Sequence, residues 1–176
     1  MVRIALIHAL ADSVAPINTA LARDWPEAER MNLLDDSLST DLARSGRLDE
    51  RMTARFLALA DYAANAGAHA IQFTCSAFGP CIEAAARRHA PMPVFKPNEA
   101  MIDEAVGLLR EPAGAGGHSG WRGRLGLVAS FPPTLTSMRG EFPLGMPLDT
   151  ALAEGALAAL QAGDPATHDR LVADAA

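Results

Sequence analysis

Cys75 is the residue whose type and position point most directly to chemistry. The segment from Ile71 to Pro80 reads as a short buried strand, a turn of small residues and the start of an Ala-rich helix. Free N–H groups at a helix start favour a thiolate, and ligands bind at the carboxyl ends of strands in open α/β sheets. We therefore expect Cys75 to be a reactive thiol with a lowered pKa. The alternative is a buried cysteine that packs as a small apolar side chain.

Hydroxyl side chains flank this cysteine on both sides. Thr74 and Ser76, with the nearby backbone N–H groups, suit the oxygens of a carboxylate, while the sulfur removes a proton or attacks. The sequence thus indicates a small carboxylate as the substrate. The second cysteine, Cys81, lies on the following helix, and we expect it to have a structural role.

Polar residues also follow the first strand. Asp12 and Ser13 either cap the next helix or hold a substrate ammonium and share a proton with it, and the sequence leaves both readings open. His8, at the same edge, is a candidate for assisting proton transfer, although a structural histidine is the simpler interpretation.

Other strand ends carry polar residues of the same kind. Ser130 and Thr134 stand where a helix begins after a strand, which makes them candidate anion ligands. Asp35 and Asp36 are expected to cap a helix or remain solvated, and Lys96 is expected to be an exposed lysine.

Apolar runs and helical patterns alternate along the chain, which predicts an α/β fold with a mostly parallel sheet. The predicted strands are Val2–Ile7, Arg30–Leu34, Ala68–Thr74, Val94–Phe95 and Arg124–Ala129. The predicted helices are Val14–Arg23, Leu48–Ala66, Cys81–Arg88, Glu99–Leu109, Thr134–Arg139, Thr150–Ala162 and Pro165–Ala175. We expect two lobes, residues 1–97 carrying Cys75 and residues 98–176, and a flexible Gly-rich connection at 111–123.

Composition excludes several classes of function. The chain has 176 residues, a net charge of −6 and 2 cysteines, which argues against nucleic-acid or membrane partners and for a soluble cytoplasmic protein. No segment is a signal peptide or reaches transmembrane length. The histidines lack metal-ligand spacing, and no phosphate loop or GxSxG sequence occurs. We therefore expect neither a metal nor a cofactor.

These residues together resemble the aspartate/glutamate racemase superfamily, which includes hydantoin racemases, maleate isomerases and arylmalonate decarboxylases. The resemblance rests on Thr74-Cys75-Ser76, on Asp12-Ser13 and on the segment from Ser130 to Ser137. It implies two pseudo-symmetric Rossmann-like lobes facing a cleft, a homodimer or higher homo-oligomer, and a racemase or isomerase that needs no cofactor such as pyridoxal phosphate. Cys75 and Asp12 would be catalytic, and Ser13, Thr74, Ser76, Ser130 and Thr134 would bind the substrate.

The chain departs from the family in one important respect. Members of the family carry one cysteine per lobe, whereas no cysteine follows Cys81 here, and we expect the second lobe to lack the final strand-and-helix unit. A second acid such as Asp12 or His8 would have to replace the missing thiol. Otherwise Cys75 acts as a nucleophile on a double bond, or as the single acid of a decarboxylase. A carboxylate-binding protein without catalysis is the remaining reading.

Overall fold

The computed structural model describes residues 1–110 and 120–176. The predicted α/β class with parallel strands is confirmed, since every strand pair in both sheets is parallel. Contacts within the chain divide it into two compact units, Met1–Pro97 and Asn98–Ala176, which are described separately below.

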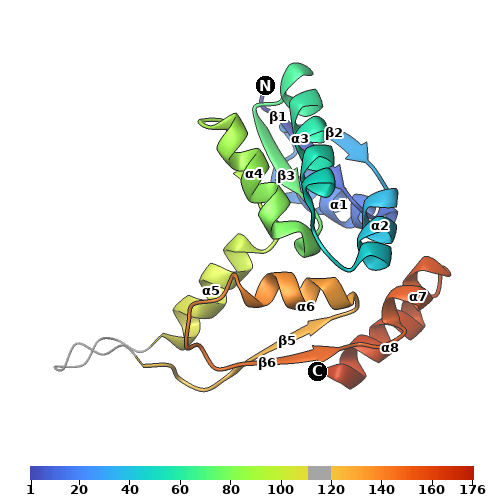
Figure 1. The fold of residues 1–176 in the computed structure, drawn as a ribbon, viewed down its shortest axis with the longest axis vertical. Coiled ribbons are helices and arrows are strands. Elements are labelled where there is room, and N and C mark those ends of the chain that lie inside the picture. The colour runs from blue at the N-terminus through green and yellow to red at the C-terminus, as the bar shows by residue number, and fades with distance from the viewer. Residues whose placement is uncertain (111–119) are drawn as a thin grey trace. The chain divides into compact units, whose positions relative to one another are not determined.

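Unit 1 is built around a four-stranded sheet with the strand order β2-β1-β3-β4 (Figure 1). Its elements are β1 (Arg3–His8), η1 (Ala11–Ser13), α1 (Val14–Asp24), β2 (Glu29–Leu34), α2 (Ser37–Ser45), α3 (Glu50–Asn65), β3 (Ala70–Phe73), η2 (Ser76–Phe78), α4 (Gly79–His89) and β4 (Val94–Phe95). Central β1 is buried along nearly its whole length. This is the pattern of a parallel strand covered by helices on both faces.

The carboxyl ends of β1, β2 and β3 lie at one edge of this sheet. In the strand register His8 pairs with Leu34 and Ile7 pairs with Phe73. The ladder continues one residue further on both sides, because Asp35 N donates to His8 O at 3.1 Å and Thr74 N donates to Ile7 O at 3.0 Å. His8 is therefore held between the residues that follow its two neighbouring strands.

The two faces of the sheet have different coverings. Ile4 and Leu6 of β1 pack with Ile17 and Leu21, which places α1 on one face. On the other face Phe73 of β3 stacks on Phe56 of α3, with ring centroids 5.2 Å apart. Successive strand side chains alternate between faces, so neighbouring residues at the end of β3 are directed toward different helices.

Helix α3 packs on the second face. Its first turn is capped by Asp49, whose carboxylate accepts a hydrogen bond from Met52 N at 2.8 Å. Its buried side chains recur at helical spacing and are Met52, Phe56, Ala60 and Ala63. Figure 1 shows α4 running beside α3, and the two helices are in contact. Phe78, just before α4, adds a third ring 4.8 Å from Phe56.

Unit 2 has a smaller sheet in which β5 and β6 pair in parallel. Its elements are α5 (Glu99–Leu109), β5 (Leu125–Ala129), α6 (Pro132–Arg139), β6 (Leu148–Leu152), α7 (Ala156–Gln161) and α8 (Pro165–Ala175). The buried core of this unit contains Ile102, Leu127, Met138, Phe142 and Met146.

The structure differs from the sequence-based prediction of the elements at two places. Helix α2 was not predicted, and residues 150–152, predicted as the start of a helix, belong to strand β6. The division into units falls at Pro97–Asn98, the boundary expected between the two lobes, and a flexible connection was expected in the Gly-rich stretch at 111–123. Residues 111–119 of that stretch lie outside the described residues.

Across the described parts of the chain, no helix combines the length and the apolar character needed to cross a bilayer.

Candidate active site

Cys75 lies two residues after the end of β3, just before the single turn of η2. It stands at the N-cap position of η2 and is half-buried with a free thiol. Burial raises the pKa of Cys75, and hydrogen bonds with the Ala77 backbone and the Ser39 side chain only partly oppose this effect. The expected lowering of this pKa is therefore wrong. The physical reason is that α4 begins four residues later at Gly79, so only a short 3-10 turn offers its N–H groups to the sulfur.

The Cys75 side chain faces the helices α2 and α3. It lines a narrow cavity with Leu38, Phe56 and Phe73, together with the ends of β1. This cavity has no room for a water molecule. The apolar surroundings disfavour the charged thiolate, and the group therefore rests as a neutral thiol at neutral pH.

This burial predicts the rate at which Cys75 reacts with iodoacetamide. Because the thiolate is the attacking species, alkylation should be slow at pH 7 and should rise about tenfold per pH unit until the raised pKa is passed. Mass spectrometry of the peptide containing Cys75 measures the rate, and a Cys75→Ser variant shows any background from Cys81. Fast alkylation that is independent of pH between 6 and 8 would contradict the raised pKa.

Thr74, the residue before Cys75, is directed toward the opposite face and meets two partners there. Its Oγ1 lies 2.9 Å from Nδ1 of His8 and 3.0 Å from Oγ of Ser13. Ser13 Oγ is also 3.1 Å from His8 Nδ1 and donates to Leu10 O at 2.7 Å. The structure thus brings together two of the predicted substrate-binding residues, Ser13 and Thr74, around a histidine.

His8 is fully buried beneath these two hydroxyl groups. Its second ring nitrogen, Nε2, lies 3.0 Å from Oδ1 of Asn32 on β2. Desolvation lowers the pKa of His8, and the hydrogen bond with Asn32 opposes this only in part. The imidazole is therefore neutral at neutral pH.

An open depression lies in front of the hydroxyl pair. It has a volume of about 520 Å³, within the range of small-molecule sites, and its wall is formed by α1 and the ends of β3 and β4. The residues lining it are Ser13, Pro16, Ile17, Ala20, Gln72, Phe73, Thr74 and Pro97. None of these side chains carries a charge, and most are apolar.

The other predicted site residues of unit 1 lie near this region. Asp12 is half-buried in the middle of η1, and its carboxylate makes no hydrogen bond to any residue that the structure describes. Ser76 is the first residue of η2. Cys81 is completely buried on α4, with its sulfur 3.5 Å from Thr53 Oγ1, which agrees with the expected structural role.

Ser130 and Thr134 belong to unit 2. Ser130 directly follows β5, and Thr134 lies in the first turn of α6 with its N–H bonded to Phe131 O at 3.0 Å. The structure therefore confirms their positions at a strand end and a helix start.

The residues after β2 serve mainly in capping and ion pairing. Asp35 accepts hydrogen bonds from Ser37 N and Oγ and forms an ion pair of 2.6 Å with Arg55 of α3. Burial raises the pKa of Asp35, but its partners outweigh this and hold the pKa below its usual value. Asp36 occupies the N-cap position of α2 without a side-chain bond. Lys96 was expected to be exposed, but its side chain is only 16% exposed and pairs with Glu83 at 3.1 Å.

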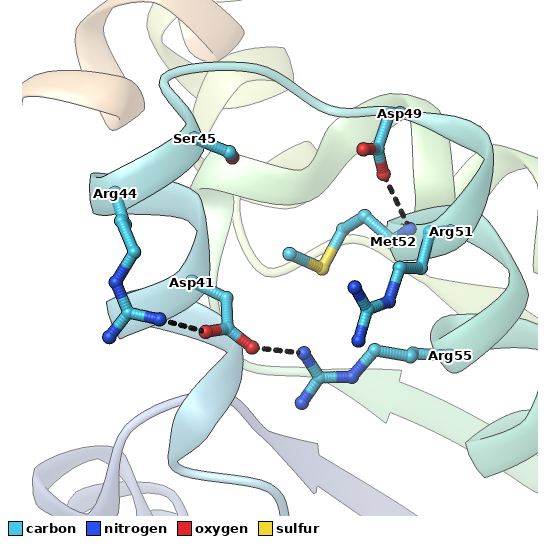
Figure 2. A pocket seen from close by; sticks show the side chains of 7 residues that line it. All are labelled: Asp41, Arg44, Ser45, Asp49, Arg51, Met52 and Arg55. Carbon is cyan, nitrogen blue, oxygen red and sulfur yellow. Dashed lines mark hydrogen bonds and ion pairs between the residues drawn. The ribbon is translucent and has the colours of Figure 1, made fainter.

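A second pocket of about 300 Å³ lies between α2 and α3. Figure 2 shows Asp41 bonded to both Arg44 and Arg55, with Arg51 nearby. Arg55 also holds Asp35, and Asp49 belongs to the same wall. The positive charges are thus matched by carboxylates, so this pocket offers little attraction for an anion. Within the described residues no cluster of His, Cys, Asp and Glu has the geometry of a metal site.

Sequence reasoning missed three residues that shape the site. Ser39 reaches Cys75 from α2, and its hydroxyl donates to Ala9 O at 2.8 Å. Asn32 and Asn18 bond to each other beside His8. The alternation of the β2 segment Arg30-Met31-Asn32 places Asn32 on the α1 face, and this is the one sequence signal that could have found it.

No family model matches the chain, and no curated protein matches it in sequence. The structure is similar to glutamate racemase from Aquifex pyrophilus, with a TM-score of 0.62, 14% identity, and coverage of 85% of this chain and 54% of that chain. It is also similar to glutamate racemase from Francisella tularensis subsp. tularensis SCHU S4 in complex with D-glutamate, with a TM-score of 0.61, 12% identity, and coverage of 92% and 57%. The chain spans just over half the length of these enzymes, and it has the fold of the glutamate racemases.

Proposed function

We propose that this chain carries a racemase- or isomerase-type site that acts, without a cofactor, at the carbon next to a carboxylate of a small substrate. The observation that carries the proposal is the position of Cys75, a free and partly accessible thiol at the carboxyl end of β3 in a fold shared with glutamate racemases. Because fold alone does not establish activity, the argument rests on the chemistry of the residues at that edge.

The chemical difficulty for such an enzyme is the weak acidity of a carbon next to a carboxylate. Loss of its proton creates an enediolate, and preorganised N–H and O–H donors that stabilise this charge are usually the largest catalytic contribution. Ser76 follows Cys75 in the sequence and supplies one hydroxyl group, and the hydroxyl groups of Thr74 and Ser13 lie 3.0 Å apart on the other side of the chain. Asp12 would orient the substrate or relay a proton.

Because Cys75 is a neutral thiol, we expect it to donate a proton to the substrate. A thiol with a raised pKa holds its proton at neutral pH, so it delivers a proton to a carbanion more readily than it removes one. The same property favours a second candidate function, a decarboxylase in which Cys75 protonates the enediolate left after loss of carbon dioxide. Both reactions share the same intermediate and the same acid.

The lining of the depression bears on the substrate. Its wall is mostly apolar and has no cation to bind a second carboxylate. A substrate with one carboxylate and an apolar or aryl arm therefore fits better than a dicarboxylate such as aspartate.

Proton NMR in deuterated water tests this proposal. The panel should contain apolar and acidic amino acids, hydantoins, arylmalonates and maleate, each with the wild-type protein and with a Cys75→Ala preparation as the control for contaminating enzymes. Deuteration at the carbon beside the carboxylate supports the racemase or isomerase reading, and loss of a carboxylate supports the decarboxylase. Ligands that raise the melting temperature without any turnover would contradict catalysis and indicate a binding protein.

A further inference from the structure

His8 stands out among the polar side chains of unit 1. Among the residues that the structure describes, His8 is the only polar or charged residue that is buried, with 0% of its surface exposed. All three side chains bonded to its ring are neutral, namely Ser13, Thr74 and Asn32. A buried imidazole without a charged partner needs a reason to be there.

The hydrogen bonds of Asn18 determine which ring nitrogen carries the proton. Asn18 Nδ2 donates to Val14 O at 2.8 Å, which fixes the orientation of this amide. The same Nδ2 donates to Asn32 Oδ1 at 2.7 Å, so an oxygen of Asn32 faces both Asn18 and His8. Because that oxygen can only accept, Nε2 of His8 must be the donor.

In the neutral imidazole the lone pair is consequently on Nδ1. Two hydroxyls face this atom, but the hydrogen of Ser13 is already donated to Leu10 O. Thr74 Oγ1 lies 2.9 Å from Nδ1 and 3.4 Å from its other acceptor, Ile7 O, so the shorter contact makes Thr74 the donor to Nδ1. Thr74 also lines the open depression, so its oxygen lies between a ligand in the depression and the buried base.

The same atoms accommodate an extra proton without moving. When Nδ1 is protonated it donates to Thr74 Oγ1, Thr74 donates to Ser13 Oγ across 3.0 Å, and Ser13 continues to donate to Leu10 O. Every hydrogen in this chain of bonds then has an acceptor. The cluster is thus satisfied in the form that has received a proton.

We propose that His8 is a positioning residue that accepts the substrate proton through the hydroxyl of Thr74. This inference rests on the proposed function, because it names the base for the carbon acid. The ring would act on a ligand in the depression only through Thr74, because Thr74 lines the depression and His8 does not.

Protons and electrons balance in this proton-transfer step. The C–H bond of the substrate breaks as an O–H bond forms on Thr74. The original O–H bond of Thr74 breaks at the same time, as an N–H bond forms on His8 Nδ1. The electron pair of the C–H bond stays on the substrate as an enediolate. The imidazolium then releases its proton to solvent, which restores the neutral base.

The first experiment identifies the tautomer and needs no substrate. A two-bond ¹H–¹⁵N spectrum of the wild-type protein at pH 7 should show His8 with its proton on Nε2 and a lone pair on Nδ1. An Asn32→Leu variant removes the acceptor and should disturb this pattern. A proton on Nδ1 in the wild-type protein at neutral pH would overturn the proposal, whatever the substrate panel shows.

The second experiment measures deuterium exchange in a His8→Asn variant. Asparagine retains a hydrogen-bonding atom near the place of Nδ1 but cannot take up a proton, so the exchange rate should fall by about 10²–10⁴-fold with little change in KM. The matched control is His69→Asn at the other end of the β1–β3 pair, where the ring only accepts a bond from Arg3 N. This control should leave the rate unchanged.

A third pair of variants keeps the test decisive should the His8 variant fold poorly. Thr74→Val removes the hydroxyl and should lower the exchange rate to a similar extent, and Thr74→Ser should restore most of it. Exchange that persists in His8→Asn or Thr74→Val would overturn the relay while leaving the proposed function intact. Turnover of no panel member would instead contradict the proposed function, and the tautomer spectrum would still decide the state of His8.

Discussion

Cys75→Ala should lower the rate of substrate deuteration or decarboxylation by at least about 10²–10⁴-fold, the contribution typical of one proton-transferring group. The half-buried thiol stands at the N-cap position of a one-turn helix, and alanine fills nearly the same space without an exchangeable proton. The fold should therefore change little. Rates from proton NMR, with circular dichroism as the check on folding, measure this result.

Cys81→Ala is the matched control for this prediction. Cys81 is completely buried on α4 beside Thr53, so its loss should reduce stability and leave the exchange rate largely unchanged. Activity lost in the folded Cys81 variant and retained in the Cys75 variant would show that the chemistry depends on the other sulfur.

Phe56→Ala should lower the free energy of unfolding of unit 1 by about 3–5 kcal/mol, the range for removing a buried aromatic ring. Phe56 is 1% exposed and contacts the rings of both Phe73 and Phe78. Those two rings flank the segment that carries Thr74 and Cys75. The cavity left by the substitution should therefore loosen the site as well as the core.

Urea denaturation followed by tryptophan fluorescence can isolate this effect. Trp25 belongs to unit 1 and Trp121 to unit 2, so a Trp121→Phe background reports on unit 1 alone. Tyr62→Ala on the same helix is the control, because its ring is 61% exposed and its loss should cost under about 1 kcal/mol. Equal losses for the two aromatic residues would contradict the packing described for Phe56.

Elements with clear end signals were predicted closely. Helices Glu99–Leu109 and Pro165–Ala175 and strand Val94–Phe95 have the predicted bounds. Helix α2 was missed because its polar sequence resembles a loop, although Leu38 and Leu42 are buried one turn apart and Gly46 ends it with φ 66°. At residues 150–152 the alanine- and leucine-rich sequence favours a helix, but pairing with β5 overrides that preference.

The sequence predicts which residues follow the strands at the site, but it predicts few of the contacts between their side chains. The sequence places Ser13, Thr74 and His8 at one edge, and strand order brings them into contact. The bonds from Asn32 and Ser39 depend on the register of β2 and on the unpredicted α2. The pKa of Cys75 was predicted in the wrong direction because the degree of burial of a side chain depends on packing by distant segments.

The alternation at the end of β3 has a consequence for how this site can be altered. Thr74 faces α1 and Cys75 faces α2 and α3, so one peptide bond separates two environments that share almost no neighbours. Substitutions on α1 should change the shape of the depression and the hydrogen bonds of Ser13 and Thr74. Substitutions on α2 or α3 should change the pKa of the Cys75 thiol. Selection or engineering can therefore change specificity and acid strength independently, with effects that add when variants from the two sides are combined.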